Sequence, residues 1–381
     1  MKETLIVLIR NNRFIYAIYY YLMTFLVNVL KIFVKTDPNL ILFVSFGGRY
    51  FNDSPKCLYD AMKKDTRFQN CRLVWGFREP DAFKDVKEKV KIDTLNYYIT
   101  ALKARCWITN VHIERGVNFK GKHTFYLNTT HTILPKVTGT LIDRKNTFTS
   151  KGGSKCDCYT VQCEFERDIL EVDNSLVQVI GYPKSDILAN YTHEYYIQVR
   201  NKLRIPSGKK VILYAPTFRE GKDRSVPLKV DFKKWEEVLG EDYIVLFRAH
   251  PVVACNLEID SSNTFVKDFS SYSDNNDLII ASDILISDYS GIFFEFGVQD
   301  KPMFCYAYDY DEYIKIRPLY FDIRKELPGG FLNESDLLHY IKSGDRVEIM
   351  ELVKSFKEKY ITVYGNATSK CLDIIHSSIK K

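Results

Sequence analysis

Three apolar runs in the second half of this chain end in residues that can contact an anion: Arg219, Arg248 with His250, and Ser290 with Gly291. Arg248 and His250 are two positions apart, so their side chains point to the same side of an extended strand. A helix that begins near Ser290 would add its backbone N–H groups. Together these donors predict a phosphate-bearing ligand. Taken singly, Ser290 fits an ordinary helix cap, and Arg248 with His250 fits a salt bridge and a core histidine.

A second candidate lies in the stretch TTHTILPKVTG, residues 129–139. His131 stands where an apolar run gives way to Pro135 and Gly139, which places it at the end of a strand. A loop histidine bonded to the backbone is the default interpretation. The alternative is a general base, because an imidazole titrates near neutral pH.

Motifs of several other enzyme classes are absent from the sequence. It contains no G-x-x-x-x-G-K-[ST], G-x-G-x-x-G or G-x-S-x-G, which argues against P-loop, dinucleotide-dependent and serine-hydrolase chemistry. Asp309 and Asp311 are interpreted as solvated loop residues. Nine cysteines without a C-x-x-C pair indicate a reducing compartment, and Cys156, Cys158 and Cys163 fit strand positions better than a zinc site. We expect neither a metal nor a cofactor.

Short β-rich runs alternate with helical periods after Pro38, which predicts an α/β fold with parallel sheets. The runs predicted as strands include residues 40–46, 71–77, 106–111, 177–183, 211–218, 243–250, 283–288 and 302–308. We expect two doubly wound, Rossmann-like domains that face one another across a cleft, because ligands bind outside the carboxyl ends of such strands. The predicted division is a membrane-association helix over 1–36, a first domain over 37–203, and a second domain over 204–381 that ends in helices.

The segment 14–34 is almost wholly apolar and long enough to span a bilayer. Thr24, Asn28, Lys31 and Lys35 form a polar stripe at helical spacing, which is typical of a helix lying in the membrane interface. A spanning helix, a cleaved signal and a helix packed on the protein's own core remain alternatives. The formal net charge of +6 is spread along the chain, which suits an anionic partner and does not indicate nucleic acid. The sequence leaves a homo-oligomer open.

Several long motifs in one order and spacing resemble the CDP-glycerol glycerophosphotransferase family, the teichoic-acid primases and polymerases. They are LFVSFGGRYFNDSPKCLYDAM, YAPTFRE, FRAHP, DLIIASDILISDYSGIFFEF, KPMFCYAYDYDEY and RPLYFD. The resemblance implies a GT-B fold at the cytoplasmic face of the cell membrane, held peripherally. It implies transfer of glycerol phosphate or ribitol phosphate from a CDP-activated polyol donor to a lipid-linked or polymer acceptor, with release of CMP, in synthesis of a teichoic-acid-like or capsular polymer.

The resemblance also implies roles for individual residues. The family stretch W-H-G-x-P-L-K-x-x-G aligns with residues 130–139, where His131, Lys136 and Gly139 match. Thr130 replaces the tryptophan, Thr132 the glycine, and Leu134-Pro135 inverts the family's Pro-Leu. His131 is then the expected base and Lys136 with Gly139 the acceptor side. His250 is expected to be catalytic, and the donor-binding set is Arg219, Arg248, Ser290, Gly291 and Glu295.

Two other functions fit the same fold. A GT-B glycosyltransferase would use a nucleotide sugar, and an inactive membrane scaffold would keep the fold without turnover. For Glu295, a capping or salt-bridge role is the alternative to binding donor hydroxyls.

Overall fold

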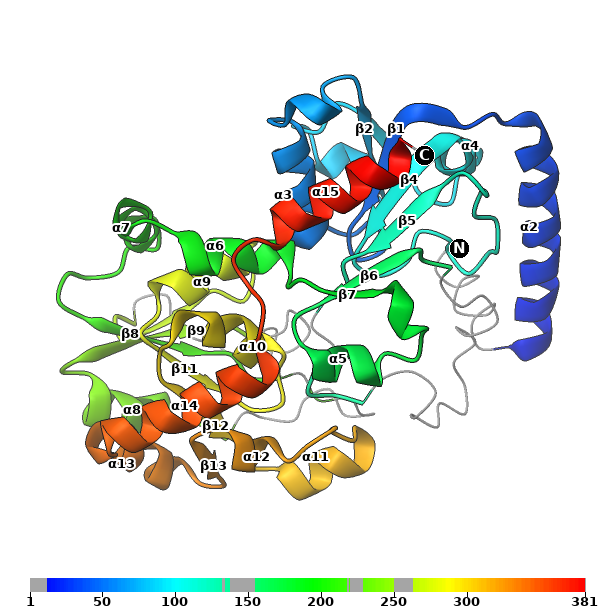
Figure 1. The fold of residues 1–381 in the computed structure, drawn as a ribbon. Helices are drawn as coiled ribbons and strands as arrows, with labels where there is room; N and C mark the ends of the chain where they lie inside the picture. The colour runs from blue at the N-terminus through cyan, green and yellow to red at the C-terminus, as the bar shows by residue number, and fades with distance from the viewer. Residues whose placement is uncertain are drawn as a thin grey trace.

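The computed structural model describes residues 12–131, 134–137, 155–217, 219, 229–249 and 263–380. They form two parallel sheets with helices packed around them, so the predicted α/β class is confirmed (Figure 1). Each of the eight apolar runs predicted as strands contains one.

The first sheet has seven parallel strands in the order β3-β2-β1-β4-β5-β6-β7. The strands are β1 (Asp37–Val44), β2 (Arg72–Phe77), β3 (Lys89–Lys91), β4 (Ala104–Thr109), β5 (Phe125–Asn128), β6 (Cys158–Val161) and β7 (Val177–Val179). The strand order reverses between β1 and β4. The loops that follow these two strands therefore diverge, and the carboxyl ends of such strands are where ligands bind in folds of this kind.

The second sheet repeats this arrangement with six parallel strands in the order β10-β9-β8-β11-β12-β13. The strands are β8 (Lys210–Tyr214), β9 (Tyr243–Phe247), β10 (Val266–Asp268), β11 (Ile284–Ser287), β12 (Met303–Tyr306) and β13 (Gly329–Phe331). Here the order reverses between β8 and β11. The residues of β9 and β11 are all buried, as expected for a sheet covered on both faces.

The α-helices of the described residues precede the first strand (α2), connect the strands (α3 to α12) or follow the last strand (α13 to α15). They are α2 (Arg13–Phe33), α3 (Asp53–Met62), α4 (Leu95–Lys103), α5 (Glu164–Ile169), α6 (Asp186–Asn190), α7 (His193–Lys202), α8 (Phe232–Leu239), α9 (Asn275–Ala281), α10 (Ile292–Phe296), α11 (Tyr310–Ile316), α12 (Ile323–Glu326), α13 (Glu334–Ser343), α14 (Arg346–Tyr360) and α15 (Ala367–Ile379).

The chain crosses between the two sheets twice. After β7 it passes through the 3-10 turn η5 (Pro183–Ser185), and Leu188 of α6 and Val199 of α7 then join the core of the second sheet. The last helix, α15, returns to the first sheet, where Cys371 is buried. By packing, α6 and α7 belong with the second sheet and α15 with the first, whereas the sequence placed a single boundary between residues 203 and 204.

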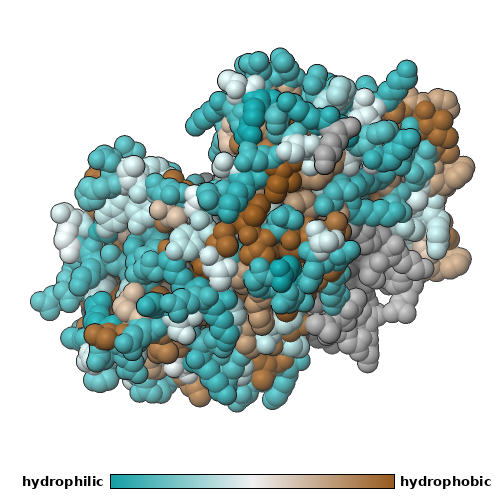
Figure 2. All heavy atoms as spheres, viewed as in Figure 1, coloured by the Kyte–Doolittle hydropathy of each residue, from teal (hydrophilic) through white to brown (hydrophobic). Residues whose placement is uncertain are grey.

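The amino-terminal helix α2 lies along the outside of the first domain (Figure 1). Its polar stripe faces the protein: Asn28 Nδ2 donates to the carbonyl of Asn118 at 2.8 Å, and Lys31 Nζ donates to that of Lys120 at 2.8 Å. The opposite face is apolar and exposed, as the brown side chains along this helix in Figure 2 illustrate. Its exposed members are Phe14, Ile15, Ile18, Tyr21, Leu22, Phe25, Leu26, Val29, Ile32 and Phe33. By length and composition α2 is apolar enough to cross a bilayer.

The start of α15 gives a test of the second crossing. The Asp186 carboxylate accepts the N–H groups of Ala367 at 2.9 Å and Thr368 at 2.7 Å. Asp186→Ala removes this cap, and we expect it to cost about 1 kcal/mol of local stability. Hydrogen exchange of the first-turn amides of α15 should accelerate about fivefold. Asp186→Asn should accelerate it less, and unchanged exchange in Asp186→Ala would contradict the capping role.

Candidate functional site

Polar side chains gather at the carboxyl ends of β1, β4 and β5, where the first sheet reverses its strand order. Asn110 follows β4, and His131 follows β5. His131 Nδ1 lies 3.0 Å from the backbone carbonyl of Asn110. A carbonyl only accepts, so Nδ1 carries the proton and Nε2 of the neutral ring has a free lone pair. This tautomer can take a proton from a ligand.

Asn110 also fixes the position of Phe46, whose ring packs against the imidazole of His131. Its Oδ1 accepts the N–H of Phe46 at 2.8 Å, and the Phe46 ring meets the His131 ring edge to face, with centroids 5.5 Å apart. Phe46 has φ +45, a left-handed conformation that the bond to Asn110 stabilises. The loop after β1 and the loop after β4 thus fix the plane of His131 together.

The pKa of His131 lies below its ordinary value. Surrounding protein desolvates the ring and has the largest effect, and the positive charge of Lys184 lowers the pKa further. The Asn110 carbonyl and the Asp53 carboxylate raise it, but by less. His131 remains exposed to solvent, so the neutral imidazole is accessible at neutral pH.

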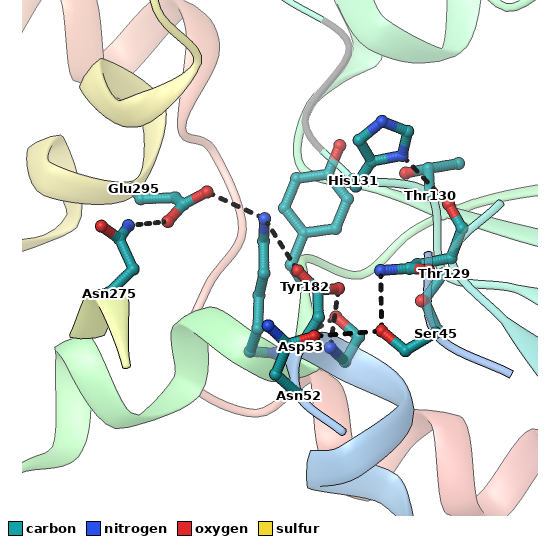
Figure 3. A network of polar contacts seen from close by, with 12 residues as sticks. Ser45, Asn52, Asp53, Thr129, Thr130, His131, Tyr182, Asn275 and Glu295 are labelled. Atoms are coloured by element: carbon teal, nitrogen blue, oxygen red, sulfur yellow. Dashed lines mark hydrogen bonds and ion pairs between the residues drawn. The ribbon is translucent and has the colours of Figure 1, made fainter. Parts of the chain in front are cut away.

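A network of charges joins the two domains beside His131 (Figure 3). Lys184 Nζ lies 2.8 Å from Glu295 Oε1 in the second domain and 3.5 Å from Asp53 Oδ2 in the first. Asn275 Nδ2 donates to the other Glu295 oxygen at 3.0 Å. Burial lowers the pKa of Lys184, but Asp53 and Glu295 outweigh burial and raise it above the ordinary value. The lysine is therefore charged.

Arg219 and Asp288 meet where the second sheet reverses its strand order. Arg219 contacts Asp288 Oδ2 at 2.9 Å and forms two bonds to Asp309, at 2.6 and 2.9 Å. The rings of Tyr289 and Tyr313 pack against its guanidinium. Two carboxylates therefore neutralise Arg219, and its role as a phosphate ligand stays a prediction. The interpretation of Asp309 as a solvated loop residue is wrong, because it is mostly buried in this ion pair.

Arg248 is placed differently from Arg219. Its guanidinium donates to the carbonyls of Phe269 at 3.2 Å and Tyr272 at 2.7 Å. Within the described part of the chain, no carboxylate lies within salt-bridge distance of it. Burial lowers its pKa, and Glu295 partly offsets that effect. Arg248 thus carries positive charge near Glu295 that an anionic ligand would neutralise.

The remaining predicted residues have these positions. Gly291 precedes the first residue of α10, as expected, and Ser290 Oγ accepts the N–H of Ile292 at 3.3 Å, which is the capping alternative. Lys136 forms an antiparallel bridge with Leu319 of the second domain. His250 and Gly139 lie outside the described residues. The described structure therefore shows Glu295 in the salt bridge that was its alternative role and places His131 beside that network, and all the catalytic and binding roles stay predictions.

Sequence reasoning missed Asn110, Asp53, Lys184 and Asn275. Asp53 lies in the stretch that resembles the family, so that motif was the available signal. Lys184 lies in a turn without any motif, and its two carboxylate partners are more than 100 residues away along the chain.

Comparison with known proteins agrees with this geometry. Residues 26–377 match the profile of the family described as CDP-Glycerol:Poly(glycerophosphate) glycerophosphotransferase. The chain is 32% identical over 377 residues to a teichoic acid poly(glycerol phosphate) polymerase of Staphylococcus epidermidis, covering 91% of this chain and 52% of that protein. It is 30% identical over 364 residues to a teichoic acid glycerol-phosphate transferase of Staphylococcus aureus, covering 88% of this chain and 92% of that one.

A solved structure gives the same answer for the fold. The wall teichoic acid polymerase TagF superposes with a TM-score of 0.81 at 32% identity, covering 91% of this chain and 90% of that one. The fold is therefore GT-B-like, and the chain belongs to the CDP-glycerol glycerophosphotransferase family, a family of transferases. It spans about half the length of the Staphylococcus epidermidis relative and nearly all of the Staphylococcus aureus one.

The contacts of Arg219 predict a structural role that is measurable without a ligand. Arg219→Met leaves Asp288 and Asp309 buried without their cation, and we expect the free energy of unfolding to fall by about 3 kcal/mol. Arg324→Met is the control, because its ion pair in the described structure is with the nearby Asp322, which is more exposed than Asp288 and Asp309. Urea denaturation without donor measures both. Equal, small losses would contradict the structural role and favour a purely ligand-binding one.

Proposed function

We propose that this protein transfers glycerol phosphate from CDP-glycerol to a hydroxyl of a lipid-linked or polymer acceptor and releases CMP. The observation that carries this proposal is the tautomer of His131. Its Nδ1 is bound to the Asn110 carbonyl, and its Nε2 is available as a base on the first-domain side of the charge network. Family membership supplies the donor class.

Glycerol is favoured over ribitol by the extent of the similarity. The glycerol-phosphate relatives from the two Staphylococcus species align with about nine-tenths of this chain. The ribitol-phosphate polymerases align with 54% of it or less. One TagF structure comes from a crystal soaked with CDPG, which supports a donor of this kind.

In the proposed step the acceptor hydroxyl oxygen attacks the phosphorus that bears glycerol. The hydroxyl proton passes to Nε2 of His131, and the bond between that phosphorus and the oxygen bridging to CMP breaks. CMP leaves with the bonding electrons, so negative charge grows on its phosphate. Arg248 and His250 face that charge in this proposal, together with Ser290 and the backbone at Gly291. Arg219 holds Asp288, which follows β11 just before Ser290.

On the acceptor side, Lys136 and Gly139 are the proposed contacts. The segment around Lys136 is supported by the second domain, since Val137 N–H donates to the Pro318 carbonyl at 3.0 Å and Tyr320 N–H to the Pro135 carbonyl at 2.9 Å. An acceptor bound to this segment would therefore be held by a part of the first domain that is hydrogen-bonded to the second. Thr130 stands in place of the family tryptophan. A difference in substrate between this protein and its relatives is therefore expected in the acceptor rather than in the donor.

The proposed location is the cytoplasmic face of the cell membrane, with α2 lying on the lipid surface. Because its polar stripe bonds to the first domain, the exposed apolar face is turned away from the protein. Burial of that face in lipid stabilises binding without a span. An acceptor with a lipid anchor would then lie at the same surface as the enzyme.

The reaction is tested by measuring CMP release from CDP-glycerol, CDP-ribitol and nucleotide sugars with acceptor analogues. We expect CDP-glycerol to be the preferred donor. His131→Ala and His250→Ala should each lower kcat by about a hundredfold or more while the protein stays folded. Release of a nucleoside diphosphate from a sugar donor would replace the proposal with a glycosyltransferase. Donor binding without any release would replace it with an inactive scaffold.

Membrane attachment is tested by flotation with anionic lipid vesicles. Phe25→Glu with Ile32→Glu places two charges on the exposed face of α2, and we expect most of the protein to leave the vesicle fraction. Ile316→Glu with Val347→Glu is the matched control, because these side chains are similarly exposed but lie on α11 and α14. Equal flotation of the α2 variant and wild type would overturn the proposed surface.

A further inference from the structure

We propose that Lys184 is a positioning residue that locks the donor-side carboxylate of Glu295 to the first domain and places a fixed positive charge beside His131. The proposal deepens the transfer reaction above and rests on it for the activity measurements only. The lysine belongs to neither sheet. It lies in η5, where the chain crosses from the first domain to the second.

The side chain of Lys184 is enclosed by partners from both domains. Its exposed fraction is 11%, and those of Asp53 and Glu295 are 9% and 13%. Lys184 Nζ also lies 5.6 Å from the centre of the Tyr182 ring, whose hydroxyl is fixed by two bonds of 2.8 Å to Glu166. The position of the ammonium group is therefore set from several directions.

The backbone of Lys184 is held by the same two domains. Its N–H donates to Ser54 Oγ of α3 at 3.3 Å, and its carbonyl accepts from Asn276 Nδ2 of α9 at 2.8 Å. Asn275, next to Asn276, donates to Glu295. One residue thus links the start of α3, the start of α9 and the carboxylate on α10.

Removal of the Lys184 ammonium group turns an attraction between the two domains into a repulsion. Asp53 and Glu295 would then be two mostly buried carboxylates with no cation between them, which repel one another. They lie on different domains, so the repulsion acts against the arrangement that brings donor and base together. An arginine at this position would retain the charge and reach both carboxylates.

The same charge acts on His131. The main charged or titratable groups that influence the imidazole are Lys184 of η5, Asp53 of α3 and His112 after β4, and the Asn110 carbonyl is bound to Nδ1. Lys184 and His112 lower the pKa of His131, and Asp53 raises it. Lys184 therefore helps to keep the base neutral and ready to accept a proton.

Proton NMR of the histidine rings tests this directly and needs no substrate. The His131 signal is assigned by its loss in His131→Asn. We expect Lys184→Met to raise the pKa of His131 and Asp53→Asn to lower it, whereas Lys184→Arg leaves it close to wild type. Lys357→Met is the control, since Lys357 is as buried as Lys184 and pairs with Asp300 at 2.7 Å away from this network. A purely structural role would not shift the pKa of His131 in opposite directions in Lys184→Met and Asp53→Asn. Absence of these opposite shifts would overturn the proposal.

Measurements of kcat/KM and its pH profile distinguish a positioning role of Lys184 from a general loss of folded structure. With CDP-glycerol, Lys184→Met should lower kcat/KM by about tenfold or more and move the acid limb of its pH profile to higher pH. Lys184→Arg should restore most of the rate. If Lys184→Met does not fold, as judged by its melting curve, Asp53→Asn carries the test with an acid limb moved to lower pH. An unmoved limb in an active enzyme contradicts this inference alone, whereas wild-type protein without CMP release contradicts the proposed function instead.

Discussion

The contact between Lys184 and the carboxylates of Asp53 and Glu295 joins the two halves of this molecule at the place where its chemistry is proposed. Each carboxylate belongs to a different domain, and each would be costly to bury without its cation. The lysine lies in the turn where the chain itself crosses between the domains. This electrostatic link therefore coincides with the first of the two crossings of the chain, and the geometry of the site depends on both.

The two sheets place polar residues at the carboxyl ends of their central strands in the same way. In each, the strand order reverses once, and the loops that follow the two central strands diverge at their carboxyl ends. In the first domain these loops supply Phe46 and Asn110, which orient His131. In the second domain they supply Arg219 and Asp288, which form an ion pair shortly before the start of α10. The proposed base in the first domain and the proposed anion contacts in the second both lie at strand ends of one topology used twice.

Much of this was predictable from the sequence, and the exceptions have physical causes. Buried parallel strands are continuous apolar runs, so eight strands and the strand-end positions of His131, Arg248 and Ser290 could be identified. Lys184 could not be identified, because a single lysine in a turn forms no sequence pattern and its carboxylate partners are distant along the chain. The polar stripe of α2 was identified by its period, but a period does not specify which face meets the protein. Asp309 was misinterpreted because its cation, Arg219, is 90 residues away.

The central claim is that the first domain supplies the base and the second domain holds the donor. Calorimetric titration of CDP-glycerol into wild type, His131→Asn and Arg248→Gln tests it most directly. The account predicts that His131→Asn binds the donor with an unchanged Kd, and that Arg248→Gln loses most of the affinity. Loss of donor binding in His131→Asn, with binding retained in Arg248→Gln, would contradict the account.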